Sequence, residues 1–140
     1  MRIRDNADGM AQTLAWLGQD FEGLCFVNLV DFDMLYGHRN DVAGYTQALN
    51  AFDSWLGGFL ARMQPEDVLM VTADHGCDPA TPSTDHSREY TPWLVYGAGV
   101  RPGVDLGTLP TFADIGRTAA GMLGVNAPVD GSDHTKTLLA

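Results

Sequence analysis

The sequence of 140 residues has little positive charge and a single lysine, Lys136. Eight Lys and Arg residues stand against 18 Asp and Glu residues, so the formal net charge is −10. A surface of this sign repels phosphate backbones and anionic headgroups, which argues against binding to nucleic acid or to a membrane surface by charge. An acidic protein that handles a phosphorylated small molecule would need metal ions to attract it.

Cysteine and long hydrophobic runs are also scarce. The two cysteines, Cys25 and Cys77, cannot form a disulfide framework, and a reducing, cytoplasmic location is expected. Cys25 lies in an apolar run and is interpreted as core, whereas Cys77 lies in a loop among Asp and His. No apolar run approaches the roughly 20 residues of a membrane span, and no signal peptide follows the basic N-terminus, so no membrane segment is expected.

Helix and strand signals alternate along the chain, which is 45% hydrophobic and therefore able to form one domain over 1–140. Near-continuous apolar strands in the order αβαββα favour an α/β fold, with a mostly parallel sheet covered by helices on both faces. The expected helices are 6–20, 42–63 and 111–123, and the expected buried strands are 24–30, 68–72 and 93–96.

The helix over 42–63 carries one apolar stripe at alternating steps of three and four residues and is interpreted as core. Asp41 or Asn40 is its expected cap, and Asn6 or Asp8 that of the first helix. In the last helix we expect Ile115, Ala119 and Met122 or Leu123 to point inward.

Candidate functional residues follow the strands, in the segments 31–41, 72–78 and 84–89. Ligands gather at the carboxyl ends of strands in parallel α/β sheets, so these segments are expected on one face. Three of the four histidines fall in them, each near an Asp. Imidazole with carboxylate suits Zn, Mn or Fe ions.

A single Asp–His pair in a loop is more often a turn or a cap than a metal site. Three such pairs at strand ends favour metal binding, because nothing structural requires a histidine at each strand end. His134 has no strand before it and is interpreted as a solvated tail residue.

The pattern of Asp-x4-His, Asp-His-Gly and a later His resembles the metal core of the alkaline phosphatase superfamily. The amino-acid sequences of segments 28–39 and 84–92 are similar to those of the corresponding segments of the phosphopentomutase family, and the resemblance runs from Asn6 to at least Val125. It implies an alkaline phosphatase-like core, a role in nucleotide metabolism, and interconversion of (deoxy)ribose 1-phosphate and 5-phosphate.

The resemblance also implies two divalent ions, typically manganese. Asp33, His38 and His86 would hold one ion, and Asp74 with His75 would belong to a separate, incomplete second site.

Family members are more than twice as long as this chain. Their N-terminal part supplies a further metal-binding Asp, a threonine nucleophile and a cap domain for the sugar phosphate. The resemblance therefore implies that 1–140 is the C-terminal portion of an incomplete catalytic domain, inactive alone. No Thr or Ser matches the nucleophile motif, so no catalytic residue is assigned.

Other interpretations stay open: another metalloenzyme of the superfamily, such as a phosphoglycerate mutase or a phosphatase, or a non-catalytic metal-binding remnant. Arg39 and Arg88 are interpreted as ion-pairing with Asp41 and Glu89 rather than as phosphate contacts. A truncated sheet would expose an edge or an apolar face, which favours self-association.

Overall fold

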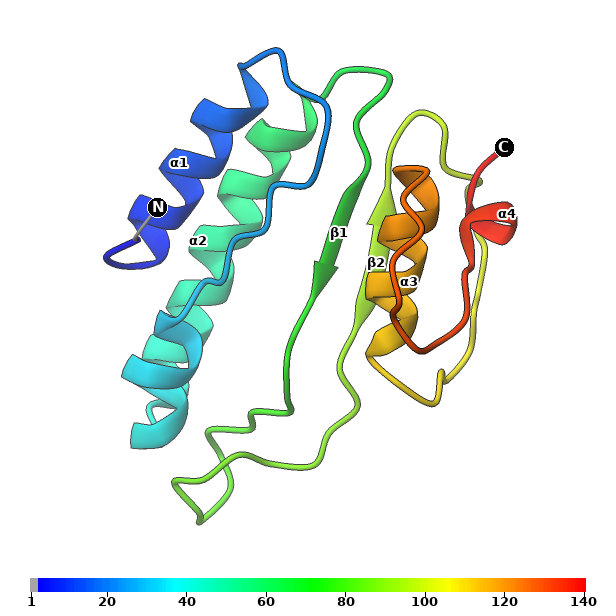
Figure 1. The fold of residues 1–140 in the computed structure, drawn as a ribbon. Helices are drawn as coiled ribbons and strands as arrows, with labels where there is room; N and C mark the ends of the chain where they lie inside the picture. The colour runs from blue at the N-terminus through cyan, green and yellow to red at the C-terminus, as the bar shows by residue number, and fades with distance from the viewer. Residues whose placement is uncertain (1–2) are drawn as a thin grey trace. The chain divides into compact units, whose positions relative to one another are not determined.

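The structure is a computed structural model that describes residues 3–140. The chain forms two compact units, each built from two separate stretches of sequence (Figure 1). The first unit contains the described residues up to Met63 together with His75–Pro92. The second contains Gln64–Asp74 and Trp93–Ala140.

The first unit is built on two helices, α1 (Asn6–Leu17) and α2 (Val42–Leu60), which pack against each other. The cap of α1 is Asp5, whose carboxylate accepts a hydrogen bond from the Asp8 amide at 2.7 Å. The expectation of Asn6 or Asp8 was wrong because Asp5 is the residue with extended backbone. At α2 the expected Asp41 is confirmed and accepts from the Gly44 amide at 2.9 Å.

Aromatic side chains on one side of α2 form the packed part of the stripe. Ring centroids lie 5.6 Å apart for Phe32 and Tyr45, 5.7 Å for Phe52 and Trp55, and 4.9 Å for Trp55 and Phe59. Phe59 is buried. The stripe is core only in part, however. Val42 and Leu49 are both 48% exposed because no described element covers that part of the helix.

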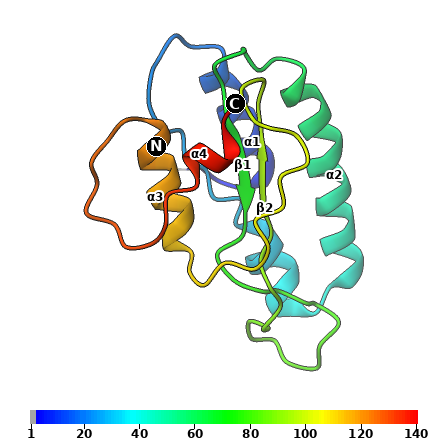
Figure 2. The same ribbon diagram turned by 90° about the vertical axis from the view of Figure 1, so that its right-hand side faces the viewer.

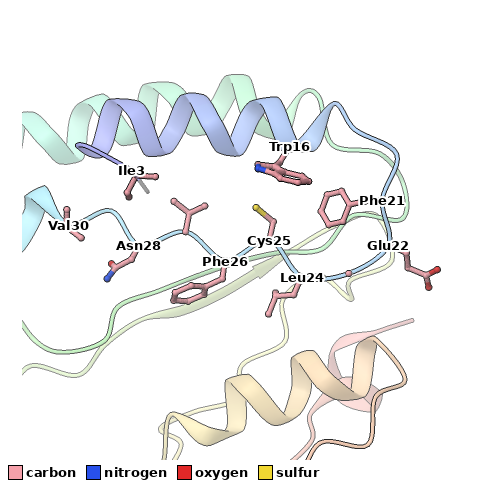
Figure 3. A pocket seen from close by; sticks show the side chains of 11 residues that line it. Ile3, Trp16, Phe21, Glu22, Leu24, Cys25, Phe26, Asn28 and Val30 are labelled. Carbon is pink, nitrogen blue, oxygen red and sulfur yellow. The ribbon is translucent and has the colours of Figure 1, made fainter. Parts of the chain in front are cut away.

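The segment 24–30 was expected to be a buried strand, and this is wrong for the described chain. It is extended but forms no strand, since it has no hydrogen-bonded neighbouring strand. Leu24 is 68% and Phe26 80% exposed, and both point away from α1 in Figure 3. Cys25, expected in the core, is exposed as well.

The opposite face of this extended segment lies along α1. Residues of both faces of the segment line an apolar groove together with Trp16 and Phe21. Trp16 of α1 meets Phe21 edge-on, with ring centroids 5.6 Å apart (Figure 3). Further along, Val27 and Leu29 approach Gly9 so closely that a methyl group there would meet the Leu29 side chain. The alternation of faces is that of a β-strand without its partner.

The second unit contains β1 (Leu69–Thr72) and β2 (Trp93–Tyr96), close to the expected ranges. They pair antiparallel, with Leu69 opposite Tyr96 (Figures 1 and 2). The α/β class is therefore found, but the expected parallel arrangement is not present in this pair. The segment between the strands is a returning loop rather than a helical crossover, and two parallel strands need such a crossover.

The helices of the second unit are α3 (Ala113–Met122) and the short α4 (Thr135–Leu138). On α3 the fully buried side chains are Asp114 and Thr118. The residues expected to point inward are only half-buried (Ile115, Ala119 and Met122) or exposed (Leu123). The apolar expectation failed because the chain after α3 returns across this helix with polar contacts (Figure 2). The amide of Ser132 donates to Asp114 Oδ1 at 2.7 Å.

His134 is not the solvated residue that was expected. Its side chain is 18% exposed, and its Nε2 lies 3.5 Å from Oδ2 of Asp114. Its ring meets Trp93 edge-on, and its amide donates to the hydroxyl of Thr118 at 3.0 Å. Sequence pattern could not indicate this, because the partners come from distant parts of the chain.

Within residues 3–140, none of the helices combines the length and the apolar character that crossing a membrane would require.

Candidate metal centre

Two consecutive tight turns place Asp33 and His38. The π-helical turn η1 (Phe32–Tyr36) continues into the 3₁₀ turn η2 (Gly37–Arg39), and the Gly37 amide donates to the carbonyls of Asp33 and Phe32. A π-helical turn brings residue i+5 back over residue i. Accordingly, His38 Nε2 lies 3.1 Å from Asp33 Oδ2.

A hairpin-like pairing brings the other two histidines together. Gly76 forms an isolated antiparallel bridge with Ser87, whose amide donates to the Gly76 carbonyl at 3.2 Å. A methyl group at position 76 would lie 2.7 Å from both the Ser87 carbonyl and the Glu89 amide, so this approach requires glycine. As a result, the rings of His75 and His86 stack with centroids 3.7 Å apart.

These turns converge in one unit on a possible metal-ligating group. Potential ligand atoms of Asp33, His75 and His86 all lie within 4.8 Å of one another. His86 Nε2 is 3.7 Å from Asp33 Oδ1, and the His38 ring lies 5.1 Å from that of His86. Four of the five candidate residues are thus brought together. The fifth, Asp74, precedes His75 in sequence and belongs to the other compact unit.

The chemistry of this group fits a divalent cation. Oδ1 of Asp33 is buried and has no hydrogen-bond partner among the described residues, which is costly for a carboxylate oxygen without a cation. His38 directs Nδ1 to the Thr84 carbonyl at 2.6 Å, and His75 directs Nδ1 to the Gly76 carbonyl at 3.0 Å. Donation from Nδ1 leaves Nε2 with the lone pair that binds a metal.

The group is open to solvent. The side chains of Asp33, His38 and His86 are 27%, 42% and 46% exposed. The hydrogen bond to the Thr84 carbonyl raises the pKa of His38 above its ordinary value; partial desolvation opposes this, and the nearby carboxylates of Asp33 and Asp85 add to it. A small anionic ligand would have access to the imidazoles and the carboxylate.

Cys77 is a supporting residue whose role the sequence did not indicate. It packs against Gly37, where a methyl group would overlap its Sγ, and it lies beside the Tyr45 hydroxyl. Burial raises the pKa of the Cys77 thiol, and the Asp33 carboxylate adds to this. Ser87 also supports the loop, since its hydroxyl accepts from the Asp78 amide at 2.7 Å. Only tertiary structure brings these partners together.

The two arginines beside the ligands are exposed. Within the described chain, the ion pairs that are present do not include the pairing of Arg39 with Asp41 or of Arg88 with Glu89. The Asp41 carboxylate instead caps α2.

An imidazole–carboxylate group of this kind fits a metalloprotein, and residues 2–127 match the family model of the metalloenzyme superfamily. The chain belongs to this superfamily, whose core is α/β and alkaline phosphatase-like.

The similar curated proteins narrow the class further. The phosphopentomutase of Lachnoclostridium phytofermentans is 59% identical over 91% of this chain and 33% of the relative. The phosphopentomutase of Acetivibrio thermocellus is 52% identical over 99% of this chain and 36% of the relative. The phosphopentomutase of Anaeromyxobacter sp. (strain K) is 61% identical over 89% of this chain and 32% of the relative. The chain therefore spans about a third of the length of these curated relatives.

Proposed function

We propose that this chain is the metal-binding portion of a phosphopentomutase that interconverts (deoxy)ribose 1-phosphate and (deoxy)ribose 5-phosphate. One observation carries the proposal: His38 and His86 meet the Asp33 carboxylate within 3.7 Å, in a chain more than half identical to proteins named phosphopentomutase. The substrate class comes from that name.

Asp33, His38 and His86 are proposed to hold one divalent ion, with Asp74 and His75 contributing to a second. The second site would be incomplete here, since catalytic metal sites usually have three protein ligands. His75 also lies within 4.8 Å of Asp33 and His86, so the two sites would be neighbours, as in other two-metal enzymes of phosphoryl transfer. Carboxylate oxygens suit manganese, which is also the metal that the family resemblance implies. When bound, the ions would offset negative charge on a transferring phosphoryl group.

The chain's own residues would orient and admit the substrate phosphate. The Thr84 carbonyl fixes the ring orientation of His38, and the half-exposed His38 and His86 leave room for an external oxygen. A net charge of −10 otherwise repels a sugar phosphate, so binding should depend on the metal.

No catalytic nucleophile is assigned within 1–140. By the family resemblance, the threonine that carries the phosphoryl group and the cap that orients the sugar lie in the remaining two-thirds of a full-length protein. We propose that 1–140 belongs to one domain of that protein in the cytoplasm. There the exposed segment 24–30 would join a mostly parallel sheet, and in isolation its apolar face favours self-association.

The test compares the 140-residue chain alone with the chain mixed with the separately expressed N-terminal two-thirds of the Lachnoclostridium phytofermentans relative. A coupled assay follows ribose 1-phosphate to ribose 5-phosphate with Mn²⁺ and a sugar bisphosphate activator. The Asp33→Ala variant is the control. We expect no turnover above this control from the chain alone, and manganese-dependent turnover in the mixture, because nucleophile and metal ligands must act together.

Turnover by the chain alone would require a nucleophile among its own residues. Absence of Mn²⁺ binding by the chain and by the mixture would contradict the ligand assignment.

A further inference from the structure

Asn40 has an unusual backbone conformation. Among residues 3–140 it is the only non-glycine residue with a positive φ, at 52°, and it directly follows the turn that carries His38. Asn adopts this left-handed conformation more readily than most residues. The conformation ends the turn just before the α2 cap at Asp41.

The Asn40 side chain holds a second, distant loop. Its amide Nδ2 lies 2.6 Å from the Thr81 carbonyl, 2.9 Å from that of Ser83 and 3.3 Å from that of Pro79. The two N–H groups of the Asn40 side chain thus donate to three backbone carbonyls about 40 residues further along the chain. The contact joins the segment after His38 to the start of the segment that carries His86.

Further hydrogen bonds connect this contact to the ligands. The Ser83 hydroxyl accepts from the Asp85 amide at 3.0 Å, and the Asp85 carboxylate accepts from the His86 amide at 2.9 Å. Between them, the Thr84 carbonyl lies 2.6 Å from Nδ1 of His38. The position of 83–86 therefore determines both the ring orientation of His38 and the place of His86.

We propose that Asn40 is a positioning residue of the metal centre. It holds 79–83 so that the Thr84 carbonyl orients His38 while His86 reaches Asp33, although the side-chain hydrogen bonds of Asn40 go to carbonyls of 79–83 and not to either ligand ring. The role in metal binding rests on the proposed function above, whereas the effect on the loop is independent of it. A change that acts through the orientation of ligands commonly weakens metal affinity by about 10- to 100-fold.

Two variants test the proposal in the 140-residue chain. Asn40→Gly permits the left-handed backbone but removes the amide. Asn40→Asp keeps the shape and places an acceptor oxygen against three carbonyls. Asn50→Ala, at an exposed position of α2, is the matched control for the loss of an asparagine side-chain amide. Far-UV circular dichroism tests whether each variant is folded. If Asn40→Gly is not folded, Asn40→Asp alone carries the test.

Three quantities are measured: Mn²⁺ affinity by calorimetry, and, without metal, amide hydrogen exchange of Asp85 and His86 and the ¹⁵N signal of His38 Nδ1. In both Asn40 variants we expect about 10- to 100-fold weaker affinity, faster exchange at both amides and loss of the Nδ1–H signature. Asn50→Ala should match the parent chain in all three.

Faster exchange with unchanged Mn²⁺ affinity would overturn the positioning role, and so would unchanged exchange in a folded variant. If the parent chain binds no Mn²⁺, the proposed function fails. The action of Asn40 on His38 and His86 is then decided by the two measurements made without metal.

Discussion

Nε2 of His38 lies 3.1 Å from Oδ2 of Asp33, five residues earlier in the chain, and Nδ1 of the same ring points to a carbonyl 46 residues further on. The ring is thus held between a local turn and a distant loop. Metal-binding histidines in proteins commonly have this arrangement, with one nitrogen toward the ion and the other toward a carbonyl or carboxylate.

Replacing Asp33 should abolish tight metal binding. Asp33→Asn keeps the size of the side chain but removes the negative charge of the carboxylate that His38 and His86 both approach, so we expect Mn²⁺ affinity to fall by more than about 100-fold, beyond the loss typical of supporting residues. Isothermal calorimetry measures the affinity. Asp53→Asn on the exposed side of α2 is the matched control and should bind like the parent chain; equal losses in both would indicate a nonspecific charge effect.

Protons should compete with the metal at a higher pH than for an ordinary histidine. The Thr84 carbonyl raises the pKa of His38 above its ordinary value, so the ring is protonated at a higher pH. Mn²⁺ affinity should therefore begin to fall, as pH is lowered, above the usual imidazole range. The NMR titration of His38 without metal gives the midpoint directly. A midpoint at or below 6.5 would contradict the prediction.

The raised pKa of His38 also determines the direction in which the stability of the chain changes with pH. The folded state binds the His38 proton more tightly than the unfolded state does. The protonated ring therefore makes its full contribution to the free energy of unfolding at pH values below the pKa of His38 in the unfolded chain. This contribution is lost as the pH rises through the folded pKa. Urea unfolding of the metal-free chain at several pH values, beside His38→Asn, isolates the contribution; a parent–variant difference that grows with rising pH would be the wrong sign.

A methyl group at position 37 should disturb the metal-bearing turn. Gly37→Ala would overlap Sγ of Cys77, and overpacking of this kind costs about 1–3 kcal/mol. The double variant Gly37→Ala/Cys77→Ala removes the overlap and should recover much of the stability. Urea unfolding of both single variants and the double variant gives the coupling energy. Simple additivity would show that the two positions do not contact each other.

The buried polar cluster of the second unit should contribute to stability. Thr118 is fully buried, and its hydroxyl accepts from the His134 amide at 3.0 Å. Thr118→Val leaves this N–H without a partner, so the free energy of unfolding should fall by about 1–3 kcal/mol. Thr108→Val, at an exposed loop position, is the control and should change it little. Urea unfolding monitored by circular dichroism measures both.

The two cysteines should differ in reactivity. Cys25 is exposed, whereas burial and the Asp33 carboxylate raise the pKa of Cys77 and reduce its thiolate fraction. At pH 8, iodoacetamide should modify Cys25 several-fold faster, as followed by peptide mass spectrometry. Equal rates would mean that the contact of Cys77 with Gly37 is open in solution.

What the sequence by itself determined is the local part of the protein. The apolar period of α2 and the Asp41 cap follow from the residues themselves, because they depend on neighbours within a few positions. The apolar runs that became β1 and β2 are local as well, although their pairing is not. The Asp-x4-His and Asp-His-Gly segments likewise indicate the candidate ligands through residue type and spacing alone.

Tertiary structure alone decided which distant residues support those segments. The contacts of Asn40 with 79–83, of Gly37 with Cys77 and of His134 with Asp114 join positions 20 to 43 residues apart, and no local period encodes them. The same reason explains the error at 24–30. Its near-continuous run of apolar residues suits a strand, but a strand forms only where another chain segment supplies the hydrogen bonds.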